Sequence, residues 1–191
     1  SVAATYPARL QSRLRSLYPR ADIVVVNRGV PGETAMGAAA RMRMEAGKSR
    51  PDLVIWQLGT NGAIARLDIE RFRDTILRTL AWLKREGIGV MLIDPQFVDR
   101  YRNHDHYARV VTMLWQVAHS EGVTLVRRFA SMQAIARRQQ LSAYLAADRF
   151  HLNDLGYRCL ASYAALAIQR SAEPLPRDLR PAAIAAERRA E

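Results

Sequence analysis

Short runs of β-branched and apolar residues alternate along this chain with longer segments in which apolar residues recur every three or four positions. The short runs predict buried strands, and the longer segments predict amphipathic helices. We expect strands at 23–27, 53–58, 90–93 and 123–126, and helices at 6–17, 34–46, 68–86, 108–121, 131–138 and 154–169. This alternation is typical of an α/β protein with a parallel sheet.

The alternation ends near residue 171. The segment 172–181 contains three prolines, and the last ten residues are rich in Ala, Glu and Arg. Such a composition does not favour a packed element. We therefore predict one domain over residues 1–171, which is long enough to bury a core, and a flexible C-terminal tail over 172–191.

The chain carries a formal net charge of +11, supplied mostly by arginine. A nucleic acid or another anionic partner is one interpretation of this charge, and a solvated helical surface is the other. The arginines are spread over every predicted helix and do not form one stripe interleaved with aromatic residues, which favours a solvated surface and no specific nucleic-acid partner. The single cysteine, Cys159, excludes an internal disulfide, and no apolar run is long enough to span a membrane.

The most informative candidate chemistry is at Asp148 and His151, on a loop that leads into the last predicted helix. A carboxylate three residues before an imidazole can hold one ring nitrogen while the other nitrogen faces a nucleophile. This arrangement is the acid–base part of a hydrolytic triad. Asn153 or Asp154 can cap the following helix and so stabilise the loop.

Two earlier loops, each following a predicted strand, carry further candidate groups. In 27–32, two glycines and a proline allow backbone N–H groups to point outward, as a developing oxyanion requires, although such residues also form ordinary turns. In 59–62, Asn61 is either a turn residue or an amide donor to an oxyanion. His104 and His106 flank Asp105 and could bind a metal or contact a substrate, but without a third ligand we expect a solvated loop.

Taken in order, 27–32, 59–61 and 148–151 resemble three of the four signature blocks of the SGNH (GDSL-type) esterases and lipases. The resemblance extends to 6–10, which is similar to the first helix of that family. It implies a flavodoxin-like three-layer α/β/α sandwich and a serine ester hydrolase that needs no cofactor or metal.

The resemblance also implies a role for each matched residue. Gly32 would supply a backbone N–H to the oxyanion hole, and Asn61 would supply its side-chain amide. His151 would act as the general base, and Asp148 would orient it. Gly62 departs from the family, which often has Asp after the Asn.

The fourth block, Gly-Asp-Ser after the first strand, is not matched. Ser1 lies five positions before Tyr6 and has no strand before it, so it does not fit the nucleophile. We expect the nucleophilic serine upstream of Ser1, together with a first strand that would lie between 23–27 and 53–58 in a flavodoxin-like sheet. On this interpretation the chain by itself lacks its nucleophile.

Three functions follow from these observations. The first is hydrolysis, or transfer, of small acyl esters carried by a small molecule or a carbohydrate. The second is a non-catalytic SGNH-fold protein that binds a ligand or a carbohydrate. The third, supported by charge alone, is a basic nucleic-acid-binding module.

Overall fold

The computed structural model of the protein describes residues 5–171, which fall into two compact units. Unit 2 runs from Gly29 to Ser142, and unit 1 joins the residues up to Arg28 to those from Ala143 onward. Ser1 and the predicted tail, 172–191, lie outside the described residues.

Unit 2 contains the sheet, and its elements alternate as the sequence predicts. In chain order they are α2 (Ala35–Ser49), β1 (Leu53–Gln57), α3 (Thr60–Ile64), α4 (Ile69–Arg85), β2 (Gly89–Ile93), the 3₁₀ helix η2 (Asp99–Tyr101), α5 (Asp105–Ser120), β3 (Thr124–Val126) and α6 (Arg128–Arg137). The strands are parallel in the order β1-β2-β3, with Leu53 opposite Gly89 and Met91 opposite Thr124. The predicted α/β class with a parallel sheet is confirmed.

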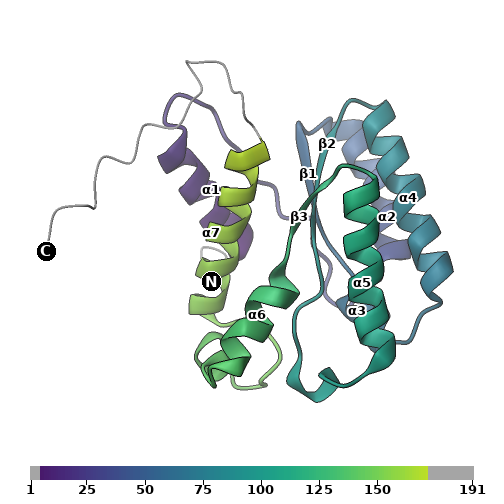
Figure 1. Ribbon diagram of the computed structural model, residues 1–191. Helices are drawn as coiled ribbons and strands as arrows, with labels where there is room; N and C mark the ends of the chain where they lie inside the picture. Colours follow the sequence, from purple (N-terminus) through teal and green to yellow (C-terminus); the bar gives the residue numbers. More distant parts are fainter. Residues whose placement is uncertain (1–4, 172–191) are drawn as a thin grey trace, which may run out of the picture. The chain divides into compact units, whose positions relative to one another are not determined.

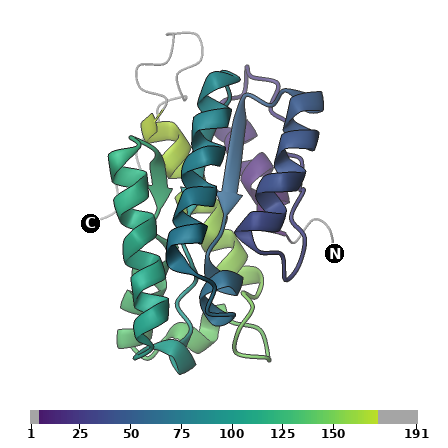
Figure 2. The ribbon, with the colours of Figure 1, turned by 90° about the vertical axis from the view of Figure 1, so that its right-hand side faces the viewer.

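Helices α2, α4 and α5 lie side by side on one face of this sheet (Figures 1 and 2). Helix α4 begins at an Asp68 cap, whose carboxylate accepts a hydrogen bond from the Arg71 N–H. The core below the helices is apolar and fully buried, and it includes Phe72, Ile76 and Leu80 of α4, Leu92 of β2 and Leu114 of α5. Burial of each such side chain stabilises the unit by about 1.5–3 kcal/mol.

Unit 1 is built around two helices. Helix α1 (Tyr6–Leu17), with Pro7 in its first turn, packs along α7 (Asp154–Ser171). The buried stripe of α1 consists of Leu10, Leu14 and Leu17, and α7 contributes small residues, Ala161, Ala164 and Ala165. The predicted bounds of α1 are confirmed. A 3₁₀ turn, η3 (Leu141–Tyr144), precedes the loop that carries Asp148.

The predicted strand at 23–27 is wrong. The segment does not pair with another strand in the described part of the chain, and Val24 and Val26 are 66% and 61% exposed. Its backbone groups bond to side chains of α1 instead: Val25 N–H donates to Gln11 Oε1 at 2.7 Å, and Arg15 Nε donates to the Ile23 carbonyl at 2.7 Å. A β-branched run favours a strand only where a ladder partner satisfies its backbone.

Three further differences concern helix starts. The predicted loop at 59–62 contains the start of α3, a five-residue helix too short to show a hydrophobic period. Helix α5 begins at Asp105 rather than Ala108, because the polar residues before Ala108 form its first turn. Helix α6 begins at Arg128 rather than Ser131. These differences lie at the ends of strands or helices, where sequence patterns are least informative.

Candidate active site

The predicted His–Asp pair forms within unit 1. Asp148 Oδ2 lies 2.6 Å from His151 Nδ1, and Asp148 Oδ1 accepts hydrogen bonds from the N–H groups of Phe150 and His151, each at 2.9 Å. The hydrogen bond with His151, followed by the two backbone N–H groups, lowers the pKa of Asp148 to about 2. The carboxylate is therefore ionised and can only accept, so His151 Nδ1 carries a proton; in the neutral ring this tautomer leaves the lone pair on Nε2.

The loop that presents this pair is held by Asn153. Its Oδ1 accepts from Leu155 N–H and Gly156 N–H, which caps α7, and its Nδ2 donates to the carbonyls of Ala143 and Leu145. Of the two caps expected from the sequence, Asn153 is the one that forms. Leu145 and Leu152 also form an isolated antiparallel bridge. The bridge and the cap close the loop on both sides of Asp148, so they fix where His151 emerges.

The two expected oxyanion donors, Gly32 and Asn61, lie in unit 2, and a hydrogen bond connects Asn61 to Glu33, the residue after Gly32. Asn61 Nδ2 donates to the Glu33 carbonyl at 2.9 Å. An amide carries two N–H groups, so this bond leaves a second one for another acceptor. Gly32 is exposed and has φ of +76°, a conformation that favours glycine.

Glu33 is fixed by α2. Arg41 holds its carboxylate with two hydrogen bonds, from Nε at 3.1 Å and from Nη2 at 2.6 Å, and also binds Glu45 at 3.0 Å. The Arg41 hydrogen bonds lower the pKa of Glu33. Such a two-point contact orients the Glu33 backbone as well as its charge. The loop at Gly32 is thus attached both to α2 and to Asn61.

The loop that carries Asn61 is packed closely at Gly59. The φ of Gly59 is +99°, and a Cβ there would lie 2.7 Å from Pro95 Cγ and 2.9 Å from Leu114 Cδ1. Since neither neighbour can withdraw without disturbing the core, no larger residue fits. The glycine therefore brings the start of α3 against the loop that follows β2.

A buried polar cluster, which the sequence does not reveal, surrounds the next residue, Thr60. Its Oγ1 accepts from Gln96 N–H at 3.1 Å and from Arg128 Nη2 at 3.3 Å. Tyr107 Oη donates to the Gln96 carbonyl at 2.7 Å. Burial raises the pKa of Tyr107 to about 12, so its hydroxyl stays protonated.

Asp94 extends this cluster at the end of β2. Its side chain is fully buried and accepts from Trp115 Nε1 and from Phe129 N–H, each at 2.7 Å, while Arg128 Nε donates to its carbonyl at 3.2 Å. Burial raises the pKa of Asp94 against the effect of these partners. The sequence signal for the cluster is a polar residue within three positions after each strand: Thr60 after β1, Asp94 after β2 and Arg128 after β3.

His104 and His106 are partly buried at the start of α5 rather than solvated as expected. Arg66 Nη2 lies 2.8 Å from His104 Nε2, and because arginine only donates, this nitrogen accepts. Burial lowers the pKa of His106. Between residues 5 and 171, the structure contains no group of three or more His, Cys, Asp or Glu side chains that could hold a metal.

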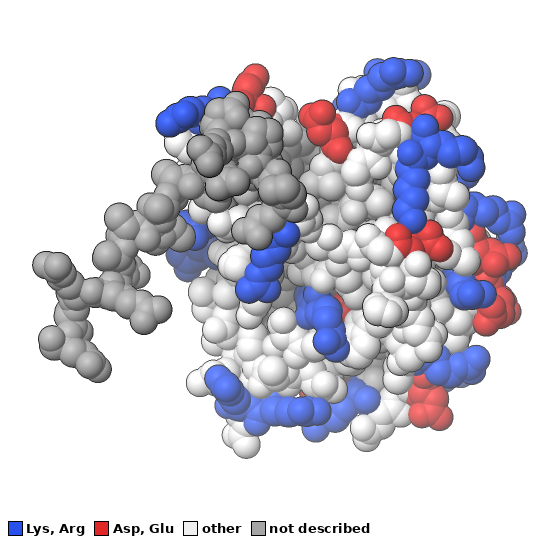
Figure 3. All heavy atoms as spheres, turned by 45° about the horizontal axis from the view of Figure 1, so that its top comes forward, with Lys and Arg blue, Asp and Glu red and all other residues white. Residues whose placement is uncertain are grey.

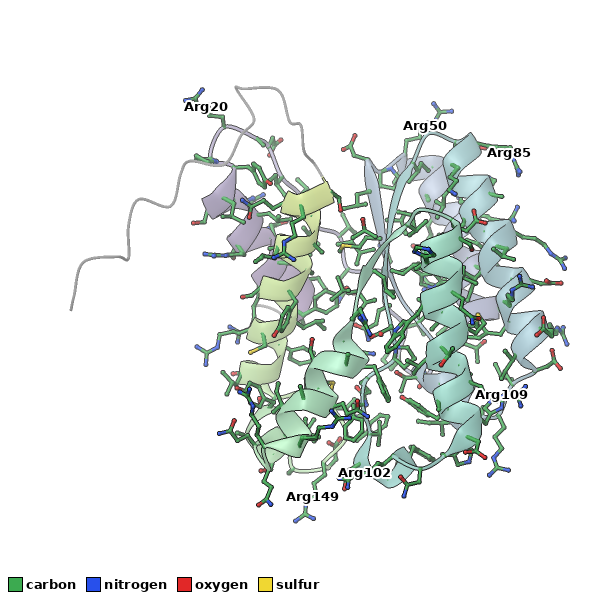
Figure 4. The ribbon with its side chains drawn as sticks, viewed as in Figure 1. Arg20, Arg50, Arg85, Arg102, Arg109 and Arg149 are labelled. Atoms are coloured by element: carbon green, nitrogen blue, oxygen red, sulfur yellow. The ribbon has the colours of Figure 1, made fainter. Side chains whose placement is uncertain are left out.

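Basic side chains are distributed among acidic ones. On the face drawn in Figure 3, red carboxylates lie among the blue Lys and Arg groups. Six arginines labelled in Figure 4 extend outward from separate segments, and they are Arg20, Arg50, Arg85, Arg102, Arg109 and Arg149. Within residues 5–171 no helix has the length and hydropathy needed to cross a membrane.

Comparison with known proteins identifies a family and several relatives for this chain. The model of the non-GDSL lipase-like family matches residues 1–174. The chain belongs to this family. An acetylxylan esterase of Geobacillus stearothermophilus is 26% identical over 172 residues, which cover 82% of this chain and 77% of the relative. An arylesterase of Vibrio mimicus is 24% identical over 122 residues, or 58% of this chain and 61% of the relative.

A solved structure of an acetyl xylan esterase, AlAXEase, superimposes with a TM-score of 0.76 at 19% identity, covering 86% of this chain and 91% of that one. This likeness supports the expected SGNH-hydrolase fold. Membership of the non-GDSL lipase-like family confirms the resemblance to the SGNH/GDSL-type hydrolases, and with it the expected enzyme class, a carboxylic ester hydrolase.

Proposed function

We propose that this member of the non-GDSL lipase-like family is a serine esterase that removes acetyl and other short acyl groups from the hydroxyls of small molecules or carbohydrates. The observation that carries the proposal is the 2.6 Å contact between Asp148 and His151, which sets the ring tautomer that a general base needs. The acetylxylan esterase relative supports a carbohydrate ester as the substrate.

In the proposed reaction, a serine oxygen attacks the acyl carbon while His151 Nε2 takes the serine proton. Gly32 N–H and the Asn61 amide donate to the oxyanion of the tetrahedral intermediate, where a single donor is worth about 3–4 kcal/mol. The ester C–O bond then breaks, and His151 returns the proton to the leaving alcohol. Water, activated by the same histidine, releases the acid. Asp148 stabilises the imidazolium at each transfer.

We propose that the nucleophile is a serine upstream of Ser1 in the natural polypeptide. Between residues 5 and 171 every serine lies in a helix, and none follows a strand; they are Ser12, Ser16, Ser49, Ser120, Ser131, Ser142, Ser162 and Ser171. A helical serine lacks the sharp turn after a strand that exposes a nucleophilic hydroxyl. We propose that an upstream strand adds to β1 on the side opposite β2 and carries the serine at its end.

The activity is tested on the natural full-length polypeptide with p-nitrophenyl acetate and with acetylated xylo-oligosaccharides. His151→Ala should lower kcat by at least about 10³-fold, since a triad loses most of its advantage with its base. His119→Ala is the matched control, because His119 is exposed in the last turn of α5 and should leave kcat unchanged. Equal rates for the two variants would exclude the proposed base, whereas no hydrolysis by the parent polypeptide would favour a non-catalytic binding protein.

The nucleophile is located by labelling the same polypeptide with a fluorophosphonate and mapping the modified peptide by mass spectrometry. We expect the label on one serine that precedes Ser1, and no label in His151→Ala. A label on any serine from Ser1 to Ser171 would overturn the upstream assignment while leaving the esterase proposal intact.

A further inference from the structure

The hydroxyl of Thr60 accepts two hydrogen bonds. A hydroxyl has one donor and two acceptor positions. Thr60 Oγ1 accepts from Gln96 N–H and from Arg128 Nη2, and the Tyr107 hydroxyl donates to the Gln96 carbonyl. Gln96 therefore connects Thr60 to Tyr107 through its backbone N–H and C=O, and Arg128 binds Thr60 from α6.

The partners of Thr60 are buried, while Thr60 itself is partly exposed. Tyr107, Gln96 and Arg128 are 1%, 6% and 6% exposed, so the two groups that donate to the Thr60 hydroxyl have little access to water. A buried donor left without its acceptor is costly, so the two hydrogen bonds fix the Thr60 hydroxyl. This cluster also connects the ends of all three strands, because Thr60 follows β1, Gln96 follows β2 and Arg128 follows β3.

The next residue along the chain is Asn61. Its side chain is held from the opposite direction by the Glu33 carbonyl, and Gly59 keeps the preceding backbone against Pro95. A donor acts on an oxyanion only when it is oriented before the reaction, and a displacement of about 1 Å can lower the rate about 10²-fold. The orientation of the Asn61 amide depends on the backbone that Thr60 fixes.

We propose that Thr60 is the positioning residue for Asn61, and that the reaction requires its hydroxyl, held by Gln96 and Arg128, rather than its bulk. This inference rests on the proposed role of Asn61 as an oxyanion donor. It predicts that the effect of losing the hydroxyl disappears once the Asn61 amide is gone.

The test is a double-mutant cycle on the natural full-length polypeptide, with kcat and KM measured on p-nitrophenyl acetate. Thr60→Val keeps the shape and removes the hydroxyl, and it should lower kcat about 10- to 100-fold with KM changed by less than about twofold. Thr60→Ser should restore kcat to within about threefold. In an Asn61→Ala background, Thr60→Val should change kcat by less than about twofold.

The matched control is Thr79→Val. Thr79 is 1% exposed and donates to the Thr75 carbonyl within α4, so the same change is made at a buried site away from Asn61, and kcat should not change. If Thr60→Val does not fold, Arg128→Lys, which keeps the charge but not the two-point contact, takes its place in the cycle.

The possible outcomes separate the two proposals. If Asn61→Ala leaves kcat unchanged, the proposed oxyanion role is wrong. If Asn61→Ala lowers kcat but the Thr60 effect is absent, or multiplies independently with it, the positioning role alone is overturned.

Discussion

Replacement of Asp148 with Asn is the sharpest single test of the candidate active site. Asparagine can keep the contacts of Oδ1 with the two backbone N–H groups, so the loop retains its shape. Its amide nitrogen then faces His151 Nδ1 as a donor. The ring must accept there, which moves its proton to Nε2, and a protonated Nε2 cannot take a proton from serine.

The expected magnitude depends on exposure. In a buried triad this substitution lowers kcat by about 10⁴-fold. Here the side chains of Asp148 and His151 are 49% and 67% exposed, so water weakens the interaction and allows the ring to reorient. We therefore expect kcat to fall by about 10²- to 10³-fold, with KM within about threefold of the parent value.

The assay is steady-state hydrolysis of p-nitrophenyl acetate at pH 7.5, which is about one unit above the ordinary pKa of histidine. Asp154→Asn is the matched control. Asp154→Asn removes the same charge from the same unit. The Asp154 side chain is 73% exposed and lies 3.5 Å from Arg9, so an exposed ion pair of this kind contributes little, and the variant should keep kcat within about twofold of the parent value. The reasoning is refuted if Asp148→Asn retains more than half of the parent kcat while His151→Ala is inactive.

Three predictions concern stability. The folded-state pKa of Asp148 is depressed to about 2, so its contribution is present above pH 4 and lost as pH falls toward 2; the Tm difference between parent and Asp148→Asn should shrink over that interval. Gly59→Ala should lower the free energy of unfolding, measured in urea, by about 2–4 kcal/mol. Gly47→Ala is the control: a Cβ there meets no atom within 4 Å, so the free energy of unfolding should rise by up to about 1 kcal/mol. Equal effects of the two substitutions would contradict the close packing at Gly59. Asp94→Asn places an amide N–H opposite the indole N–H of Trp115, so two donors face each other, and the free energy of unfolding should fall by about 1–3 kcal/mol. The same substitution at the exposed Asp99 should lower it by less than about 0.5 kcal/mol in the same urea titration.

The features that the sequence predicts well depend on contacts between near neighbours. The Asp148–His151 pair spans three residues, and the Thr34 side chain caps α2 by accepting from Gly37 N–H at 3.4 Å, also three residues away. Helix α1 follows from the spacing of its leucines. At such separations the backbone geometry alone decides which groups can meet, so the pattern of residue types is sufficient.

The sequence by itself therefore determined the α/β alternation, the parallel sheet, the main helices and the His–Asp pair. The tertiary structure alone decided two other matters. It left 23–27 without a strand partner in the described residues, and it joined Thr60 to Gln96 and Arg128, which are 36 and 68 positions away. Such contacts depend on the order of the strands and on which polar groups become buried together, and no local pattern encodes either.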